Sequence, residues 1–145
     1  MTGFFNSVIG NTVSALRVGY ISHSRFIILP SNKLSRQLLN KLVDCGVISH
    51  FSDYRCNVSS KLSKRTLYGR YVKIFLSYID GKPVPTAFRL LSKPSARYYI
   101  TYNVLQRYML TRRGILLIST SRGILTAGEA VNIRVGGCLL LWVLL

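Results

Sequence analysis

Acidic residues are scarce in this sequence of 145 residues. The four that occur are Asp44, Asp53, Asp80 and Glu129. They oppose 20 lysines and arginines, so the net charge is +16 at pH 7. A charge of this size is best accommodated beside a polyanion, because neutralising phosphates releases condensed counterions and offsets the self-repulsion of the free protein. The composition therefore favours a nucleic-acid partner.

Histidine and cysteine are also few, which limits the chemistry available to the chain. The histidines are His23 and His50, and the cysteines are Cys45, Cys56 and Cys138. The cysteines lack the short spacing of zinc sites, so we expect three reduced thiols. No phosphate-binding loop or nucleophile elbow occurs. The sequence predicts a protein that is not an enzyme, with no catalytic residue, no metal, no cofactor and no small-molecule substrate.

Long apolar runs are missing, although 49% of the residues are hydrophobic. The longest run, residues 139–145, is far shorter than the roughly 20 residues of a transmembrane helix. We therefore expect no membrane span and a buried strand at this position. A protein of the membrane surface would need a strongly basic amphipathic helix, whereas the first predicted helix carries only Arg17.

Two helices are predicted in the first half of the chain. Apolar residues recur at helical spacing from Phe4 to Leu16, which indicates a helix ending near Gly19. A stripe of leucines after Ser31, the predicted cap, indicates a second helix that ends before Gly46. Strands are predicted at residues 25–29, 47–54 and 68–79, and a basic loop at residues 57–66. In the strand at 68–79 the residues alternate, which places Val72, Ile74, Leu76 and Tyr78 on one face and Tyr71, Lys73, Phe75 and Ser77 on the other.

The second half is predicted to be mainly β. The turn signal at residues 80–83 is closely followed by Pro85, so the preceding strand cannot continue and a boundary is expected there. Strands are predicted at residues 87–91, 97–102 and 115–118 and at the C-terminus, with short helices at residues 104–110 and 127–133. The predicted fold class is α+β, with an N-terminal α/β subdomain, residues 1–82, packed on a C-terminal mainly β subdomain, residues 83–145.

Basic residues are interleaved with tyrosines from Arg55 to Lys73 and from Lys93 to Arg113. Such a mixture suits RNA, because cations reach phosphates while tyrosine rings stack on unpaired bases. For Tyr71 and Tyr102 we favour the alternative of a ring packed within a strand. RNA is therefore the expected polyanion.

A turn rich in hydroxyl groups follows the apolar strand at residues 115–118. Its sequence is Ser119-Thr120-Ser121-Arg122-Gly123. Hydroxyls held at the end of a rigid strand can meet base edges, 2′-hydroxyls and phosphate oxygens, and a glycine lets the backbone approach closely. A turn with this composition can also be only a turn.

This segment resembles the Ser-Thr-Ser-Lys-Gly loop of ribosomal small-subunit protein eight in its bacterial and organellar form. The resemblance extends along almost the whole chain. It includes Leu29-Pro30-Ser31-Asn32-Lys33-Leu34, Cys45-Gly46-Val47-Ile48, Gly81-Lys82-Pro83, Ser92-Lys93-Pro94, Ile124-Leu125-Thr126, Glu129-Ala130 and Val135-Gly136-Gly137. One departure is Cys138, which stands where the family usually has glutamate.

The resemblance implies an α/β domain packed on a mainly β domain that binds the central domain of small-subunit rRNA, beside neighbouring small-subunit ribosomal proteins. It implies RNA contacts for Ser119, Thr120, Ser121, Arg122, Gly123, Lys33, Lys93, Tyr99 and Arg17, and Arg97 belongs to the same expected site.

The predicted function is that of a structural constituent of the small ribosomal subunit that supports assembly and translation. The alternative is a free RNA-binding translational regulator, which would use the same residues. The family's first helix would begin almost at Met1, so we expect no cleavable presequence and predict an organelle-encoded mitochondrial protein. A bacterial or plastid ribosome is the alternative location.

Overall fold

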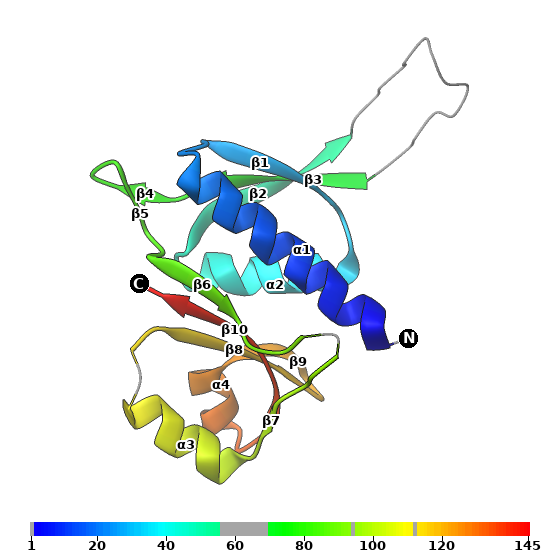
Figure 1. Cartoon of the computed structure of the whole chain (residues 1–145), viewed down its shortest axis with the longest axis vertical. Helices are drawn as coiled ribbons and strands as arrows, with labels where there is room; N and C mark the ends of the chain where they lie inside the picture. Colours follow the sequence, from blue (N-terminus) through cyan, green and yellow to red (C-terminus); the bar gives the residue numbers. More distant parts are fainter. Residues whose placement is uncertain (1, 56–69, 94, 112) are drawn as a thin grey trace.

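The computed structural model describes residues 2–55, 70–93, 95–111 and 113–145. Within these residues the fold is α+β, as predicted, and consists of helices combined with antiparallel sheets (Figure 1). The predicted basic loop at residues 57–66, including Lys61, Lys64 and Arg65, lies outside the described residues. No described helix is long and apolar enough to cross a membrane.

The N-terminal elements form a three-stranded antiparallel sheet with two helices on one of its faces. The elements are α1 (Thr2–Ile21), β1 (Phe26–Pro30), α2 (Lys33–Asp44), β2 (Ile48–Arg55) and β3 (Arg70–Leu76). The strand order is β1-β3-β2. In β3 the side chains of Val72, Ile74 and Leu76 are buried and those between them are half-buried, which confirms the alternation seen in the sequence.

Helix α1 continues past the predicted end at Gly19. A Cβ atom at Gly19 would lie 2.8 Å from Cγ2 of Ile27, so this glycine lets α1 pack closely on β1 and does not end the helix. Helix α2 is capped one residue later than predicted, by Asn32. The Ser35 hydroxyl accepts from the Asn32 backbone N–H at 3.0 Å and donates to the Asn32 carbonyl at 2.9 Å. The predicted stripe is confirmed, because Leu38, Leu39 and Leu42 are buried.

The predicted strand at residues 68–79 is interrupted at Ser77. Its pairing with β1 ends at Phe75, and the chain then forms a small hairpin of β4 (Tyr78–Ile79) and β5 (Lys82–Pro83). Asp80 and Gly81 turn this hairpin with φ values of 50° and 74°. The predicted turn is therefore confirmed, but the residues of the predicted strand belong to two different sheets, β3 to the three-stranded sheet and β4 to the small hairpin.

The C-terminal elements form a second sheet in which the last strand is central. They are β6 (Ala87–Leu90), β7 (Tyr99–Ile100), α3 (Tyr102–Thr111), β8 (Ile115–Thr120), β9 (Gly123–Thr126), α4 (Ala127–Asn132) and β10 (Gly137–Leu144). The strand order is β6-β10-β8-β9, and β7 also pairs with β10. The predicted strand at residues 97–102 is shorter than expected, because Tyr102 already begins α3.

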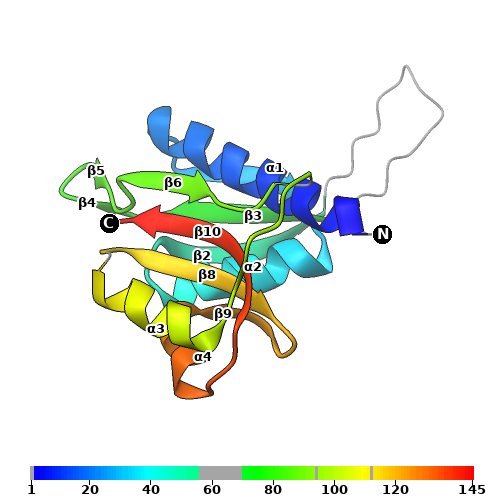
Figure 2. The same ribbon diagram turned by 60° about the horizontal axis from the view of Figure 1, so that its bottom comes forward.

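Two hydrophobic clusters cover both faces of the second sheet. The larger joins α1, α2 and the first sheet to the inner side of β8 and β10, through residues such as Leu16, Leu38, Leu117 and Leu141. The smaller joins α3 and α4 to the other side, around Leu105 and Ile118. Helices α1 and α2 thus lie between the two sheets, with α3 and α4 beneath the second (Figures 1 and 2). The division into residues 1–82 and 83–145 stays a prediction.

Candidate nucleic-acid interface

The hydroxyl-rich segment forms a tight hairpin between β8 and β9. The predicted turn of residues 119–123 is shorter in the structure, because Ser119 and Thr120 are the last residues of β8 and Gly123 is the first of β9. The strand extends this far because Ser119 pairs with Cys138 of β10 on one side and Ile124 of β9 on the other. Only Ser121 and Arg122 form the turn, and both are exposed.

The three hydroxyls of the hairpin have different environments. The Thr120 hydroxyl donates to the Gly123 carbonyl at 3.0 Å and accepts from the Arg122 backbone N–H at 3.1 Å, so it closes the turn. Gly123 has a φ of 107°, a conformation that L side chains rarely adopt. The Ser121 hydroxyl lies on the exposed turn and that of Ser119 is half-buried. Thr120 therefore holds the geometry in which the two serines are presented.

Cys138 aligns the hairpin with a second predicted RNA-binding segment. In the sheet it pairs with Ser119 on β8 and with Tyr99 on β7. Residues paired in this way point to the same side of a sheet, and two strand spacings place Tyr99 roughly 10 Å from Ser119. The Tyr99 side chain is 71% exposed. A hydroxyl turn and an exposed ring thus share one end of the sheet.

Gly137 permits the close approach of β10 and β8 at this end. A Cβ atom at Gly137 would lie 2.3 Å from the Ser119 carbonyl oxygen, which a side chain could not tolerate without a shift of the backbone. The glycine pair before Cys138 is therefore needed for the packing of the site. This role could have been inferred only from the resemblance, since a glycine pair alone also marks an ordinary turn.

A tight loop anchored by Ser92 carries the remaining basic residues of this end. Lys93 and Ala96 exchange backbone hydrogen bonds of 2.9 and 3.2 Å. The Ser92 hydroxyl is buried, accepts from the Tyr98 backbone N–H at 3.2 Å and lies 3.4 Å from the Cys138 thiol. Lys93 and Tyr98 are exposed and Arg97 is half-buried. Sequence reasoning missed the anchoring role of Ser92, because a single serine in a loop carries no periodic signal.

Lys33 and Arg17 lie apart from this arrangement. Lys33 is exposed at the first turn of α2, and the C-terminal end of that helix is tied to α4 by an ion pair of 2.7 Å between Lys41 and Glu129. The guanidinium of Arg17 donates a hydrogen bond to the Phe88 carbonyl and so links α1 to β6. The structure therefore brings eight of the ten predicted residues to one end of the second sheet and leaves these two on the helices.

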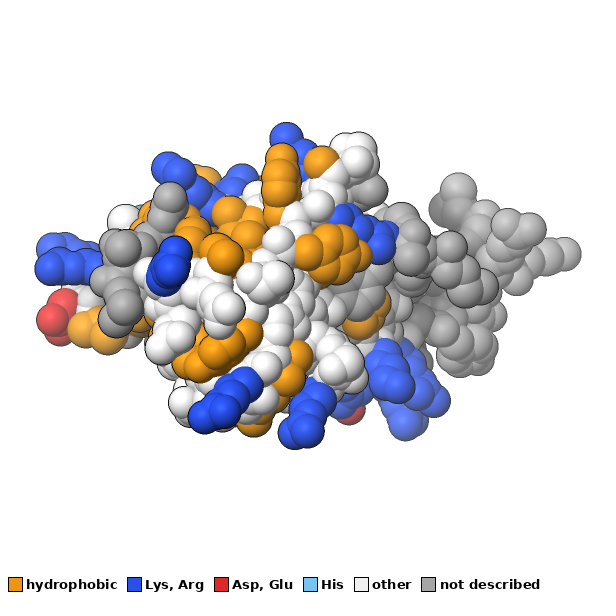
Figure 3. All heavy atoms as spheres, turned by 90° about the horizontal axis from the view of Figure 1, so that it is seen from below, with side chains coloured by type: hydrophobic (Ala, Val, Ile, Leu, Met, Phe, Trp, Pro, Cys, Tyr) orange, Lys and Arg blue, Asp and Glu red, His pale blue; other side chains and the backbone are white. Residues whose placement is uncertain are grey.

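Most of the few carboxylates are committed to ion pairs away from the hairpin. Asp53 pairs with Arg36 at 2.8 Å, and Lys41 lies within 3.8 Å of Asp44 as well as beside Glu129. The Lys41 ammonium and the Thr126 backbone N–H hold the pKa of Glu129 below its ordinary value. The face that carries α3 and α4 shows lysine and arginine side chains around its rim and few acidic ones (Figure 3). The potential around the site is therefore positive.

Cysteine chemistry is limited to free thiols in the described chain. Cys45 and Cys138 are unbridged, as expected, while Cys56 lies outside the described residues. The described residues also contain no cluster of three or more potential metal ligands. Burial raises the pKa of the Cys45 thiol.

Fold and site together define a basic α+β protein that presents hydroxyls, cations and tyrosine rings at one end of a sheet. A family model described as Ribosomal protein S8 matches residues 7–144, and the chain belongs to this family.

Similar proteins come from three kinds of ribosome. The chain is 33% identical over 141 residues to small ribosomal subunit protein uS8c of Anthoceros angustus. The aligned region covers 95% of this chain and 98% of the relative. It is 33% identical over 129 residues to protein uS8 of Baumannia cicadellinicola, covering 89% and 90%. It is 30% identical over 132 residues to protein uS8m of Acanthamoeba castellanii, covering 90% and 94%.

Proposed function

We propose that this protein is a structural constituent of the small ribosomal subunit, binds the central domain of small-subunit rRNA, and supports assembly and translation beside neighbouring ribosomal proteins. Membership of the S8 family supports the first part. The observation that carries the RNA contact is the row of Tyr99, Cys138 and Ser119 across three strands, which sets an exposed ring beside the hydroxyl hairpin. The proposed role is binding, not catalysis.

In this proposal each residue type meets a different part of the RNA. Ser119 and Ser121 offer hydroxyls that donate and accept, so they suit base edges and 2′-hydroxyl groups. Tyr99 stacks on an unpaired base. The cations contact phosphates, and these contacts fix the position of the RNA but do not specify its sequence. These cations are Lys93, Arg97 and Arg122.

The residues away from the hairpin contribute less directly to RNA binding in this proposal. Lys33 adds a phosphate contact from the first turn of α2. Arg17 contributes less to phosphate binding, because its guanidinium already donates a hydrogen bond to the Phe88 carbonyl. Cys138 acts inside the protein, where its thiol lies 3.4 Å from the Ser92 hydroxyl.

The test replaces Ser121 with alanine and compares two RNAs at constant salt. Ser121→Ala should weaken binding to a central-domain rRNA fragment three- to tenfold, the loss of a hydrogen bond worth about 1 kcal/mol, and should hardly change binding to random duplex RNA. Ser14→Ala, which removes an exposed serine from α1, is the matched control. Equal losses on both RNAs would contradict specific recognition by the hairpin.

A cation of the same turn should behave differently. Arg122→Gln should weaken binding to both RNAs and lower the slope of affinity against salt by about one, because a phosphate contact carries no sequence information. A loss confined to the rRNA fragment would instead assign Arg122 to base recognition.

Sedimentation distinguishes the ribosomal role from that of a free regulator of translation. A ribosomal constituent should stay with small subunits in high salt, whereas a regulator should be released. The relatives occur in organellar and bacterial ribosomes, and we propose the mitochondrial ribosome because the chain combines few acids with a high apolar content. Recovery of the protein with small subunits of purified mitochondria would support this location, and recovery with plastid or cytoplasmic bacterial subunits would contradict it.

A further inference from the structure

The face of the first sheet that points away from α1 and α2 carries a cluster of rings around a lysine. The register of the strands places Phe26, Phe75 and His50 in one row, Ile28, Lys73 and Ser52 in the next, and Pro30, Tyr71 and Tyr54 in the third. We call Phe26, His50, Tyr54, Tyr71, Lys73 and Phe75 the outer-face cluster. These positions alternate with the buried Val72, Ile74 and Leu76 of β3, so they point to the opposite side from the core.

The rings of the first row contact one another and the lysine. His50 and Phe75 stack with their centroids 4.3 Å apart and their planes 16° from parallel. Phe26 lies 6.2 Å from Phe75. The Lys73 ammonium lies 3.9 Å from the centroid of Phe26 and 5.2 Å from that of Phe75. The cation is thus held among the rings by cation–π attraction.

This arrangement leaves apolar ring surface open to solvent. Phe26 is 44% exposed and Tyr54 is 38% exposed, and His50 is exposed as well. The core does not require large rings here, because the larger hydrophobic cluster lies on the other face of the sheet. The contacts between Phe26, Phe75 and His50 make these rings one patch and not scattered single residues, and exposed apolar patches are typical of binding surfaces.

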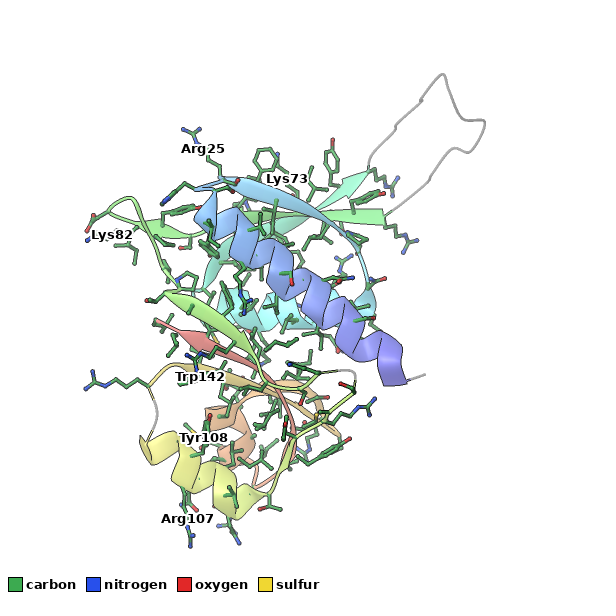
Figure 4. The ribbon with its side chains drawn as sticks, viewed as in Figure 1. Arg25, Lys73, Lys82, Arg107, Tyr108 and Trp142 are labelled. Carbon is green, nitrogen blue, oxygen red and sulfur yellow. The ribbon has the colours of Figure 1, made fainter. Side chains whose placement is uncertain are left out.

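The charge of this face is positive. Arg25 and Lys73 lie together at the outer side of the first sheet, at the opposite end of the molecule from Arg107 on α3 (Figure 4). Asp53 is the acidic residue of β2, but it alternates to the inner face and pairs there with Arg36. A ligand of this face should therefore combine negative charge with flat apolar surfaces.

We propose that the outer-face cluster binds single-stranded RNA, with unpaired bases stacked on its exposed rings and a phosphate near Lys73. This is a second RNA-binding surface, independent of the hairpin and of the proposed role of Ser121. An antiparallel sheet with aromatic rings on its open face is a suitable platform for unpaired bases, since every base offers a flat face to a ring. A protein partner would use the exposed rings, but it would not need a cation at their centre.

The experiment measures binding of a fluorescently labelled oligouridylate by anisotropy, with the full chain and at a salt concentration that suppresses nonspecific binding. Phe26→Ser should weaken binding about tenfold, because a stacked base is lost. Lys73→Gln should weaken it about threefold and lower its salt dependence. Phe26→Trp should retain the affinity, and its added fluorescence should be quenched as the oligonucleotide binds.

Two controls match these changes in chemistry. Ile21→Ser removes a side chain that is 76% exposed on α1, and Lys82→Gln removes an exposed cation from the β4–β5 hairpin. Both should bind oligouridylate as the unchanged protein does. Thermal unfolding of each variant verifies that it is folded at the temperature of the titration.

Three results would overturn the proposal. The first is a loss for Phe26→Ser no larger than that for Ile21→Ser, and the second is unchanged fluorescence of Phe26→Trp at saturation. The third is that the outer-face variants keep their RNA affinity but a smaller fraction of each co-sediments with small subunits. That result would identify a contact with a protein. The hairpin proposal is tested separately, because Phe26→Ser should still bind the central-domain fragment while Ser121→Ala should still bind oligouridylate.

Discussion

The two sheets of the molecule differ in how many of their faces are buried. In β8 of the second sheet the consecutive residues Leu116, Leu117 and Ile118 are all buried, because helices cover both sides. In β3 of the first sheet burial alternates, and the outer side carries Lys73 and Phe75. A sheet buried on both faces can present functional groups only at its ends and turns, whereas a sheet with an open face can present a whole row of side chains.

This difference separates stability from binding. Burial of a large apolar side chain contributes about 1.5 to 3 kcal/mol, so the second sheet is a rigid support for the hairpin at its end. Substitutions inside the second sheet should lower the stability of the protein more than they lower its affinity for RNA. Changes on the outer face of the first sheet should affect binding more than stability, since rings such as Phe26 and Tyr54 are already partly exposed to water.

The largest effect on stability is expected from Gly137→Ala. The new Cβ would lie 2.3 Å from the Ser119 carbonyl oxygen, and both β10 and β8 are paired with a strand on each side, so neither backbone can move cheaply. We expect a loss of about 3 kcal/mol in the free energy of unfolding, measured in urea.

Gly10→Ala is the matched control for this change. In α1 the added Cβ would meet only Cδ2 of Leu90, at 3.7 Å, which is an ordinary contact. Alanine is also the better helix former, so stability should rise by up to about 1 kcal/mol. If both glycine variants unfolded alike, the rigidity assigned to the second sheet would be wrong.

The sequence predicts this contrast between the sheets well. The apolar run before Ser119 indicated a buried strand, and the alternation around Ile74 indicated a strand with two different faces. The fold class and the positions of the main helices followed from the same periodicities. The eight residues at the hairpin end were predicted as one site from the resemblance to the family. The pairing of Cys138 with Tyr99 and with Ser119 explains why two segments far apart in the sequence lie together.

The errors have a common cause, which is that glycine and polar residues act through tertiary contacts. Gly19 was predicted to end a helix, but it packs against Ile27. Ser119 and Thr120 were predicted in a turn, but pairing with β10 and β9 keeps them in the strand. The outer-face cluster was also missed, because strand pairing that brings Phe26 beside Phe75 joins residues far apart in the sequence.

A smaller effect is expected from Thr120→Val, which tests how the rigid sheet shapes its own end. The change keeps the shape of the side chain but removes the bonds to the Gly123 carbonyl and the Arg122 N–H. We expect a loss of about 1 to 2 kcal/mol in thermal or urea unfolding and weaker binding to the rRNA fragment. Thr120→Ser keeps the hydroxyl and should retain the binding. A stable Thr120→Val variant with full affinity would show that the turn needs no internal hydrogen bond.

The smallest effect is expected at the ion pair that ties α2, beside the first sheet, to α4 beneath the second. The Lys41 ammonium lies 2.7 Å from the Glu129 carboxylate, and its hydrogen bond is the main reason that the pKa of Glu129 is lowered. A lowered pKa in the folded state means that the charged carboxylate stabilises the fold above the ordinary pKa of glutamate, about 4.3. That contribution is lost as the pH falls through the lowered pKa.

Glu129→Gln should therefore cost about 0.5 kcal/mol at neutral pH, a value kept small because the carboxylate side chain is 45% exposed to screening solvent. The difference from the unchanged protein should vanish in acid, when the native carboxyl is protonated too. Urea unfolding at a series of pH values measures it. In the double variant with Lys41→Gln, the second change should add less than it does alone, because the partner charge is already gone. Strict additivity would mean that the link between the two layers comes from apolar packing and not from this pair.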